Sequence, residues 1–161
     1  MGVDKDNRVI RVYAGHNELG PVYEELQAVQ LDDGSCELLA SPGLALNLAK
    51  GDLVCIDDVS RPAVVLKRGG NFCIQIYADA IPDTEVARLE RDVANESGGS
   101  LDGINNGNLA LTVPSINGLA SINKFFDEFK RRTGIEWYYS NVYKNFEDPT
   151  DETLLNWWRE N

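Results

Sequence analysis

Histidine is nearly absent from this sequence: His16 is the only one among 161 residues. A single imidazole rules out the helical zinc motif that needs two histidines, and nothing near His16 suggests a Ser-His-Asp or Cys-His arrangement. The sequence also lacks a Gly-x-Gly-x-x-Gly turn after a strand and a phosphate loop that ends in Gly-Lys-Ser or Gly-Lys-Thr. We therefore predict no catalytic residue, no metal site and no cofactor, and we expect the protein not to be an enzyme.

Long apolar runs are also missing. No stretch approaches the roughly 20 apolar residues that span a bilayer, and residues 1–11 lack the apolar core of a secretory signal. The three cysteines, Cys36, Cys55 and Cys73, are widely spaced, and each lies in an apolar run. They lack the close pairs of a zinc site and are typical of buried free thiols in a reducing compartment. We expect a cytoplasmic protein.

Positive charge is scarce. The chain has 15 Lys and Arg against 26 Asp and Glu, which gives a formal charge of −11. Such a protein repels phosphates, so we expect neither direct nucleic-acid binding nor contact with an anionic membrane. The hydrophobic fraction of 43% is ordinary for a globular protein. The charge instead fits a soluble protein whose partner is basic.

The first half of the chain has the pattern of short strands separated by turns. Apolar runs occupy residues 8–13, 23–31, 35–40, 53–57 and 63–67. The turn Asp32-Asp33-Gly34 between two of these runs is typical of a β-hairpin, because glycine adopts the positive φ that such turns need. We predict that residues 1–70 form a small antiparallel sheet resembling a barrel.

The second half changes to a helical period. A strand at 72–78 is followed by a helix from Asp83 to about 95, with Asp83 as its N-cap, and by a hairpin of strands 100–104 and 109–114. A second helix ends near Gly134, and a strand follows at 135–139. This β-α-β-β-α-β order predicts a ferredoxin-like unit at residues 71–161, completed by a short helix at 149–159 with Asp148 as its cap. The predicted fold class is α+β.

Acidic pairs and aromatic residues are the candidates for partner contacts. Residues 145–161 carry five acids and one base, and exposed aromatics beside acids suit a basic protein. The alternatives are that the Asp pairs only form turns and that Trp158 packs in the core. The predicted partner-binding residues are Asp32, Asp33, Asp57, Asp58, Asp148, Asp151, Glu152 and Trp157.

Several short motifs resemble an uncharacterised bacterial domain family. They combine an acidic residue before an aliphatic position, a polar hairpin, a proline in the return loop and a Gly-Asp-hydrophobic-Val strand start. They occupy Glu24–Ala28, Asp33–Leu38, Ser41–Ala45 and Ala49–Val54. Members look like immunity proteins of bacterial polymorphic toxin systems, including contact-dependent growth inhibition. The resemblance implies a small acidic cytosolic protein that neutralises one toxin domain, and it supplies no catalytic residue.

Three hypotheses follow in order of preference. The first is an immunity protein that binds a cognate toxin C-terminal domain, with a basic nuclease as the expected toxin. The second is a regulatory domain that binds a small molecule, because such a sheet can hold a ligand between its helices. The third is an enzyme, which ranks last because no catalytic constellation is present.

Overall fold

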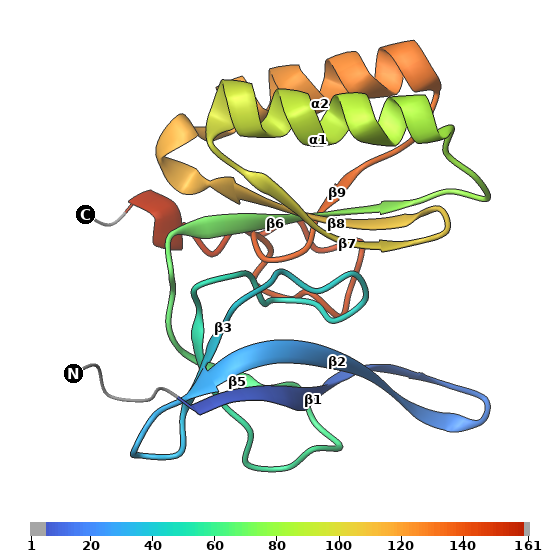
Figure 1. The fold of residues 1–161 in the computed structure, drawn as a ribbon. Coiled ribbons are helices and arrows are strands. Elements are labelled where there is room, and N and C mark those ends of the chain that lie inside the picture. Colours follow the sequence, from blue (N-terminus) through green and yellow to red (C-terminus); the bar gives the residue numbers. More distant parts are fainter. Residues whose placement is uncertain (1–5, 160–161) are drawn as a thin grey trace.

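The protein contains two antiparallel sheets and two α-helices, and the computed structural model describes residues 6–159 (Figure 1). The first sheet consists of β1 (Asp6–Asn17), β2 (Gly20–Gln30), β3 (Cys36–Leu38), β4 (Leu53–Cys55) and β5 (Val64–Lys67). The remaining elements are β6 (Asn71–Tyr77), α1 (Asp83–Ser97), β7 (Ser100–Asn105), β8 (Asn108–Pro114), η1 (Ser115–Asn117), α2 (Leu119–Thr133), β9 (Tyr138–Tyr139) and η2 (Trp157–Arg159). The α+β class is therefore confirmed.

The first sheet is a meander in which each strand pairs with the next, in the order β1-β2-β3-β4-β5. Its longest hairpin, β1 with β2, turns at Glu18 and Leu19, between the runs 8–13 and 23–31 that the sequence predicted as strands. The inner face carries an apolar cluster that includes Val12, Leu26 and Val54. Within the described residues β1 and β5 do not pair with each other, so both are edge strands.

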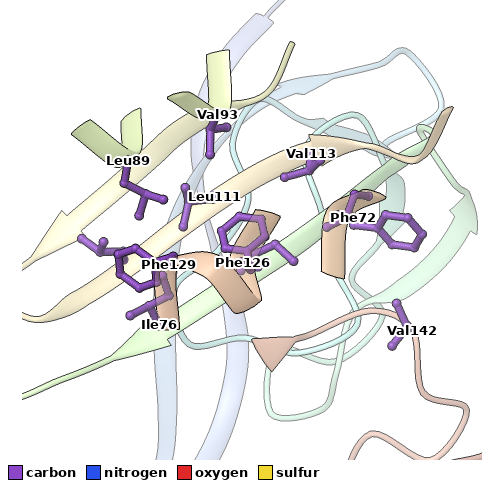
Figure 2. Packing of buried hydrophobic residues seen from close by; sticks show 12 residues of the cluster. Phe72, Ile76, Leu89, Val93, Leu111, Val113, Phe126, Phe129 and Val142 are labelled. Carbon is purple, nitrogen blue, oxygen red and sulfur yellow. The ribbon is translucent and has the colours of Figure 1, made fainter. Parts of the chain in front are cut away.

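The second sheet has the order β7-β8-β6-β9, and all of its neighbouring strands are antiparallel. Helices α1 and α2 lie next to each other on one of its faces (Figure 1). Figure 2 shows how Leu89 from α1 and Phe126 and Phe129 from α2 point onto Leu111 and Ile76 of the strands. Burial of these side chains is the main driving force for folding this half. None of the helices among residues 6–159 is long and apolar enough to cross a membrane.

Both predicted long helices are confirmed, and their ends follow from glycine. Gly98 and Gly134 adopt φ of 75° and 76°, a left-handed conformation that ends a helix without steric cost. The predicted N-cap of α1 is wrong, because Pro82 holds the cap position and Asp83 is already helical. Proline before the helix leaves Asp83 to act only through the helix dipole.

The helix predicted at 149–159 is also wrong, since only Trp157–Arg159 forms a single 3₁₀ turn. Asp148 Oδ1 accepts hydrogen bonds from Thr150 N (3.0 Å) and Thr150 Oγ1 (2.6 Å). Asp151 Oδ1 repeats the pattern with Thr153 N at 3.0 Å. Such side-chain bonds to the backbone compete with helix formation, so the chain makes successive turns.

The connection between β3 and β4, residues 39–52, lies between the two sheets (Figure 1). The Glu24 carboxylate on β2 accepts hydrogen bonds from three backbone N–H groups of this connection, at 2.7 to 2.9 Å. The donors are Gly43, Leu44 and Ala45. These groups would otherwise be costly to bury, because buried backbone donors need partners. One carboxylate of the first sheet thus fixes the middle of the connection.

Strand β6 holds the same connection from the other side. Gln75 is 1% exposed, and its Nε2 donates to Pro42 O at 3.0 Å and Ala45 O at 2.9 Å. The Tyr77 hydroxyl lies 3.0 Å from the Gly43 carbonyl oxygen. These side chains alternate with Ile76, which faces the helices. β6 is therefore buried on both faces, apolar on one and polar on the other.

Asp52 ends the connection and is fully buried. Its carboxylate accepts hydrogen bonds from Ala49 N (3.0 Å) and Gly69 N (2.9 Å), and it lies 3.5 Å from Arg68 Nη1. Burial raises the pKa of Asp52 to about 6, and the two backbone donors and Arg68 oppose that rise. Gly69 approaches so closely that a Cβ there would lie 2.3 Å from the Gly51 carbonyl carbon. Asp52 therefore joins the end of the 39–52 connection to Arg68 and Gly69, in the link between β5 and β6.

We predict that Asp52 makes stability depend on pH. The pKa of an unfolded Asp is about 3.9, so the folded protein binds this proton more tightly than the unfolded chain does. The contribution of Asp52 to the free energy of unfolding should then fall by about 3 kcal/mol as pH rises from 4 to above 6. Asp52→Asn cannot ionise and should lose this slope. Urea denaturation of both proteins between pH 4 and 7.5 measures it, and a stability difference that is constant with pH would contradict the prediction.

Candidate functional site

A groove of about 470 Å³ opens beside β9, where the C-terminal segment meets the second sheet. One wall comes from the ends of β6 and β9 and from the 39–52 connection, and the other comes from residues 143–152. The lining side chains are Leu46, Gln75, Tyr77, Tyr138, Tyr139, Tyr143, Asn145, Phe146, Asp148, Pro149, Asp151 and Glu152. The groove therefore combines aromatic rings with carboxylates.

The second wall is a closed loop. Tyr143 and Leu154 form an antiparallel bridge, and Lys144 N donates to Thr153 O at 2.7 Å. Between these ends, the two Asp-Thr turns described above hold the chain. The loop presents its acidic side chains without a helix, so the turn residues decide where the carboxylates lie.

Tyr77 and Tyr138 are the most exposed of the aromatic residues that line the groove, with exposed fractions of 43% and 51%. Their centroids are 6.2 Å apart and their planes are tilted by 46°. Burial of the Tyr77 hydroxyl raises its pKa to about 12, and burial also raises the pKa of Tyr139. The Tyr139 hydroxyl donates to Asn123 Oδ1 at 2.6 Å. Both groups therefore stay neutral, and the accessible surface of Tyr77 is ring more than hydroxyl.

The groove carries charge of one sign. Asp148, Asp151 and Glu152 line it, and no Lys, Arg or His lines it in the described part of the chain. Hydrogen bonds from the side chain and backbone of Thr153 lower the pKa of Asp151, and the charge of Lys144 adds to that effect. The site can therefore attract a cation and repel an anion.

The structure divides the predicted acidic residues into two groups. Asp148, Asp151 and Glu152 meet in the groove, whereas Asp32, Asp33, Asp57 and Asp58 lie in the turns that flank the first sheet. The hydrogen bond to Asp57 raises the pKa of the Cys55 thiol, and burial and the charges of Asp57 and Asp33 add to that rise. These two turns therefore lie close to each other.

Two of these acids form turns, as the alternative interpretation predicts. Asp33 Oδ1 accepts hydrogen bonds from Ser35 N at 2.9 Å and Ser35 Oγ at 2.5 Å. Asp58 Oδ1 holds Ser60 in the same way, at 2.9 and 2.6 Å. A turn role leaves less of each carboxylate available to a partner.

Trp157 was predicted to contact a partner from the surface. In the structure it is half-buried and packs against other side chains. Its indole Nε1 donates to Asn141 O at 2.9 Å, and its ring lies 5.2 Å from that of Phe72. Arg68 also stacks over it at 5.6 Å. Trp158 packs on Phe72 as well, at 5.3 Å. A large ring gains more from burial against the core than from exposure.

The cysteines are free, but only Cys36 and Cys73 are buried. Cys55 is half-buried, and its thiol donates to Asp57 Oδ1 at 3.1 Å. Within residues 6–159 no group of three or more His, Cys, Asp or Glu side chains could hold a metal ion.

Tyr77 is among the groove residues that sequence reasoning missed. It follows Cys73 and Gln75 on one face of a strand that is otherwise apolar. A polar alternation of this kind inside a buried strand is the signal that could have drawn attention to it. The partner ring, Tyr138, belongs to the aromatic run Trp137–Tyr139, in which Trp137 packs against Phe126 in the core.

A second cavity of about 410 Å³ lies between α1 and α2. Its floor is apolar, with Ile122 and Phe125 among the lining residues. Its rim carries three basic and three acidic side chains: Arg88, Lys124, Arg132, Asp92, Glu96 and Glu128. Arg88 and Asp92 lie 3.6 Å apart, and Arg132 pairs with Glu85, beside the cavity, at 3.1 Å. This cavity has no net preference for one charge.

Comparison with known proteins places the chain in a family. Residues 24–137 match a domain of unknown function, DUF4265. The chain belongs to the DUF4265 family. The match to this DUF4265 protein runs from the middle of β2 through β8 and both helices. Strand β1, Tyr138 and the loop at residues 143–152 lie outside it. No curated protein has significant similarity to the sequence.

A solved structure has a similar fold. It is described as a novel crystal structure of a hypothetical protein from Neisseria gonorrhoeae. The TM-score is 0.60 with 19% sequence identity, over 87% of this chain and 96% of that chain. At this level of identity the likeness concerns the arrangement of the elements.

We predict that the acids of the fold and of the groove differ in their effect on stability. Glu24→Gln replaces an acceptor of three backbone N–H groups and should lower the free energy of unfolding by about 1–3 kcal/mol. Glu152→Gln alters an exposed side chain without a hydrogen-bond partner among the described residues, so it should change stability by less than about 0.5 kcal/mol. Urea denaturation at pH 7 compares them, and equal losses would show that the groove acid also maintains the fold.

Proposed function

We propose that this protein is an immunity protein that binds a cognate toxin C-terminal domain in a one-to-one complex and neutralises it. The expected toxin is basic, and a nuclease fits best. The observation that carries the proposal is the groove beside β9, in which three carboxylates and exposed tyrosine rings meet without a basic side chain among its lining residues. Tyrosine is enriched at protein interfaces, and complementary charge selects the partner.

The charge of the whole chain supports the same partner. A formal charge of −11 accelerates the approach of a basic protein and disfavours nucleic acid and anionic membrane as direct ligands. We place the protein in the cytoplasm, where the free thiols of Cys36, Cys55 and Cys73 would stay reduced. The proposal assigns binding and no catalysis to this chain, and it needs no cofactor.

The proposal includes a finer description of the fold. Residues 71–161 would form a ferredoxin-like unit, which the strand order β7-β8-β6-β9 and the placement of both helices on one face support. Residues 1–70 would form a separate, curled, barrel-like sheet, which is supported by an apolar cluster of its own. The boundary would lie between β5 and β6, where the chain passes from one sheet to the other.

We predict that charge reversal in the groove abolishes neutralisation. The test co-expresses the protein with the toxin domain encoded by the neighbouring gene and measures cell survival and complex formation. Asp148→Lys combined with Glu152→Lys should weaken the complex at least about tenfold and remove protection. The matched control, Asp57→Lys with Asp58→Lys, makes the same change in net charge outside the groove and should retain both.

Two outcomes would contradict the proposal. If the unaltered protein neither binds nor protects, the immunity function fails. If the control variant loses protection and the groove variant retains it, the interface lies at the turns beside the first sheet instead.

The cavity between α1 and α2 favours a second candidate, a regulatory domain that binds a small molecule. Its apolar floor and charged rim suit a ligand that has an apolar part and a charged part. A thermal-shift screen with amino acids and nucleotides tests this candidate. A large shift with one compound, lost on Phe125→Trp, which would fill the cavity, would favour it over the immunity function.

A further inference from the structure

We propose that the groove beside β9 is a subsite for an arginine side chain of the basic partner. This inference deepens the proposed function, on which it rests, by stating what the partner inserts. The occupant follows from three features of the groove: exposed aromatic rings, carboxylates that the fold leaves unused, and the absence of a competing base among its described lining residues.

The aromatic feature provides a surface for a flat cation. Tyr77 and Tyr138 expose about half of their area, and the 46° tilt between their planes gives the groove faces of different orientation. The single proton of the Tyr77 hydroxyl is already in use, because two acceptors, Gln75 Oε1 and Gly43 O, lie 2.5 and 3.0 Å from the hydroxyl oxygen. What remains for a ligand is the ring face, whose negative quadrupole attracts a cation lying over it.

The carboxylates of the groove differ from those that hold the fold together. The carboxylate oxygens of Glu24 and Asp52 accept hydrogen bonds from backbone N–H groups, and Asp52 also pairs with Arg68. In the groove, Glu152 has no hydrogen-bond or ion-pair partner within residues 6–159, and Asp148 uses only Oδ1, for Thr150. Unpaired carboxylates beside aromatic rings can accept a ligand's N–H groups at no cost to the fold.

A guanidinium matches this combination better than an ammonium does. It is planar, stacks on aromatic faces, and presents several N–H donors in a fixed fork that fits carboxylates. A lysine would gain the charge attraction without the stacking. A second copy of this chain is a poor occupant, because two molecules of charge −11 repel each other.

The test is an NMR titration of the full ¹⁵N-labelled chain with three blocked tripeptides, Gly-Arg-Gly, Gly-Lys-Gly and Gly-citrulline-Gly. Citrulline keeps the shape of arginine and removes its charge. We expect the arginine peptide to shift the amide signals of Tyr77, Tyr138 and residues 145–152, with a dissociation constant on the order of 1 mM. The lysine peptide should bind about three- to tenfold more weakly, and the citrulline peptide should not bind measurably.

Variants locate the site and separate its parts. Tyr138→Ala and Glu152→Gln should each weaken arginine binding about three- to tenfold. Tyr138→Phe keeps the ring and should bind as the unaltered protein does. The double variant Asp57→Asn with Asp58→Asn removes two acids outside the groove and should also bind normally, and the amide spectra report whether each variant is folded.

Several results would overturn the inference. Equal binding of lysine and arginine would show that charge alone selects the ligand, and binding of citrulline would show that charge is not needed. Shifts spread over the surface, or equal losses in the Asp57 and Asp58 variant, would show a non-specific effect. Groove signals that move with protein concentration alone would assign the groove to a second copy.

This result can be separated from the proposed function. If the arginine peptide fails to bind while the toxin is still neutralised, the subsite is wrong and the immunity function stands. If the peptide binds in the groove but the toxin is neither bound nor neutralised, the subsite stands and the immunity function fails.

Discussion

The structure depends on the hydrogen bonding of one irregular segment, residues 39–52, between two sheets that each have an apolar core of their own. A buried segment without regular structure must find partners for its N–H and C=O groups elsewhere. Glu24, an acceptor, comes from the first sheet and takes three N–H groups, while Gln75 comes from the second sheet and gives its two N–H groups to two carbonyls. The first sheet thus supplies an acceptor and the second sheet a donor to the same short segment. These hydrogen bonds fix the two sheets relative to each other.

The same arrangement positions the groove. Gln75 and Tyr77 are two residues apart on one face of β6, so the side chain that anchors the connection and the ring that lines the groove share one strand face. Two further residues complete this wall. Leu46 comes from the 39–52 connection, and Tyr138 comes from β9, where it pairs with Gln75 of β6. The opposite wall is a loop closed by the Tyr143–Leu154 bridge and held by short turns. A firmly held aromatic wall therefore faces a loop that carries the charge.

Local sequence signals predicted the elements but not the contacts between them. The spacing of Leu89 and Val93 and the glycines at 98 and 134 specify both helices, because periodicity and left-handed caps act within a few residues. The helix predicted at 149–159 was wrong because Asp148, its expected cap, forms a turn with Thr150, and Asp151 forms another with Thr153. Long-range hydrogen bonds, in contrast, cannot be predicted from local patterns. Glu24 binds Gly43 N, and Asn141 binds Cys73 N, 68 residues away, yet nothing in the sequence distinguishes these two side chains from ordinary polar residues of the surface.

The net charge of −11 is therefore not a single property of the surface. Glu24, Asp52 and Asp102 are acceptors inside the fold, where Asp102 Oδ2 binds Ser41 N at 2.8 Å, and Asp33 and Asp58 are used to form turns. Counting acids overstates the charge that a partner can use, because a carboxylate already satisfied by backbone donors has less to gain from a new one. Glu152 and the second oxygen of Asp148 have no such bond within the described chain, and they lie beside exposed rings. In the groove, carboxylate oxygens without a bond thus lie beside Tyr77 and Tyr138, the two most exposed aromatic residues of the described chain. This is the combination that the proposed basic partner would contact.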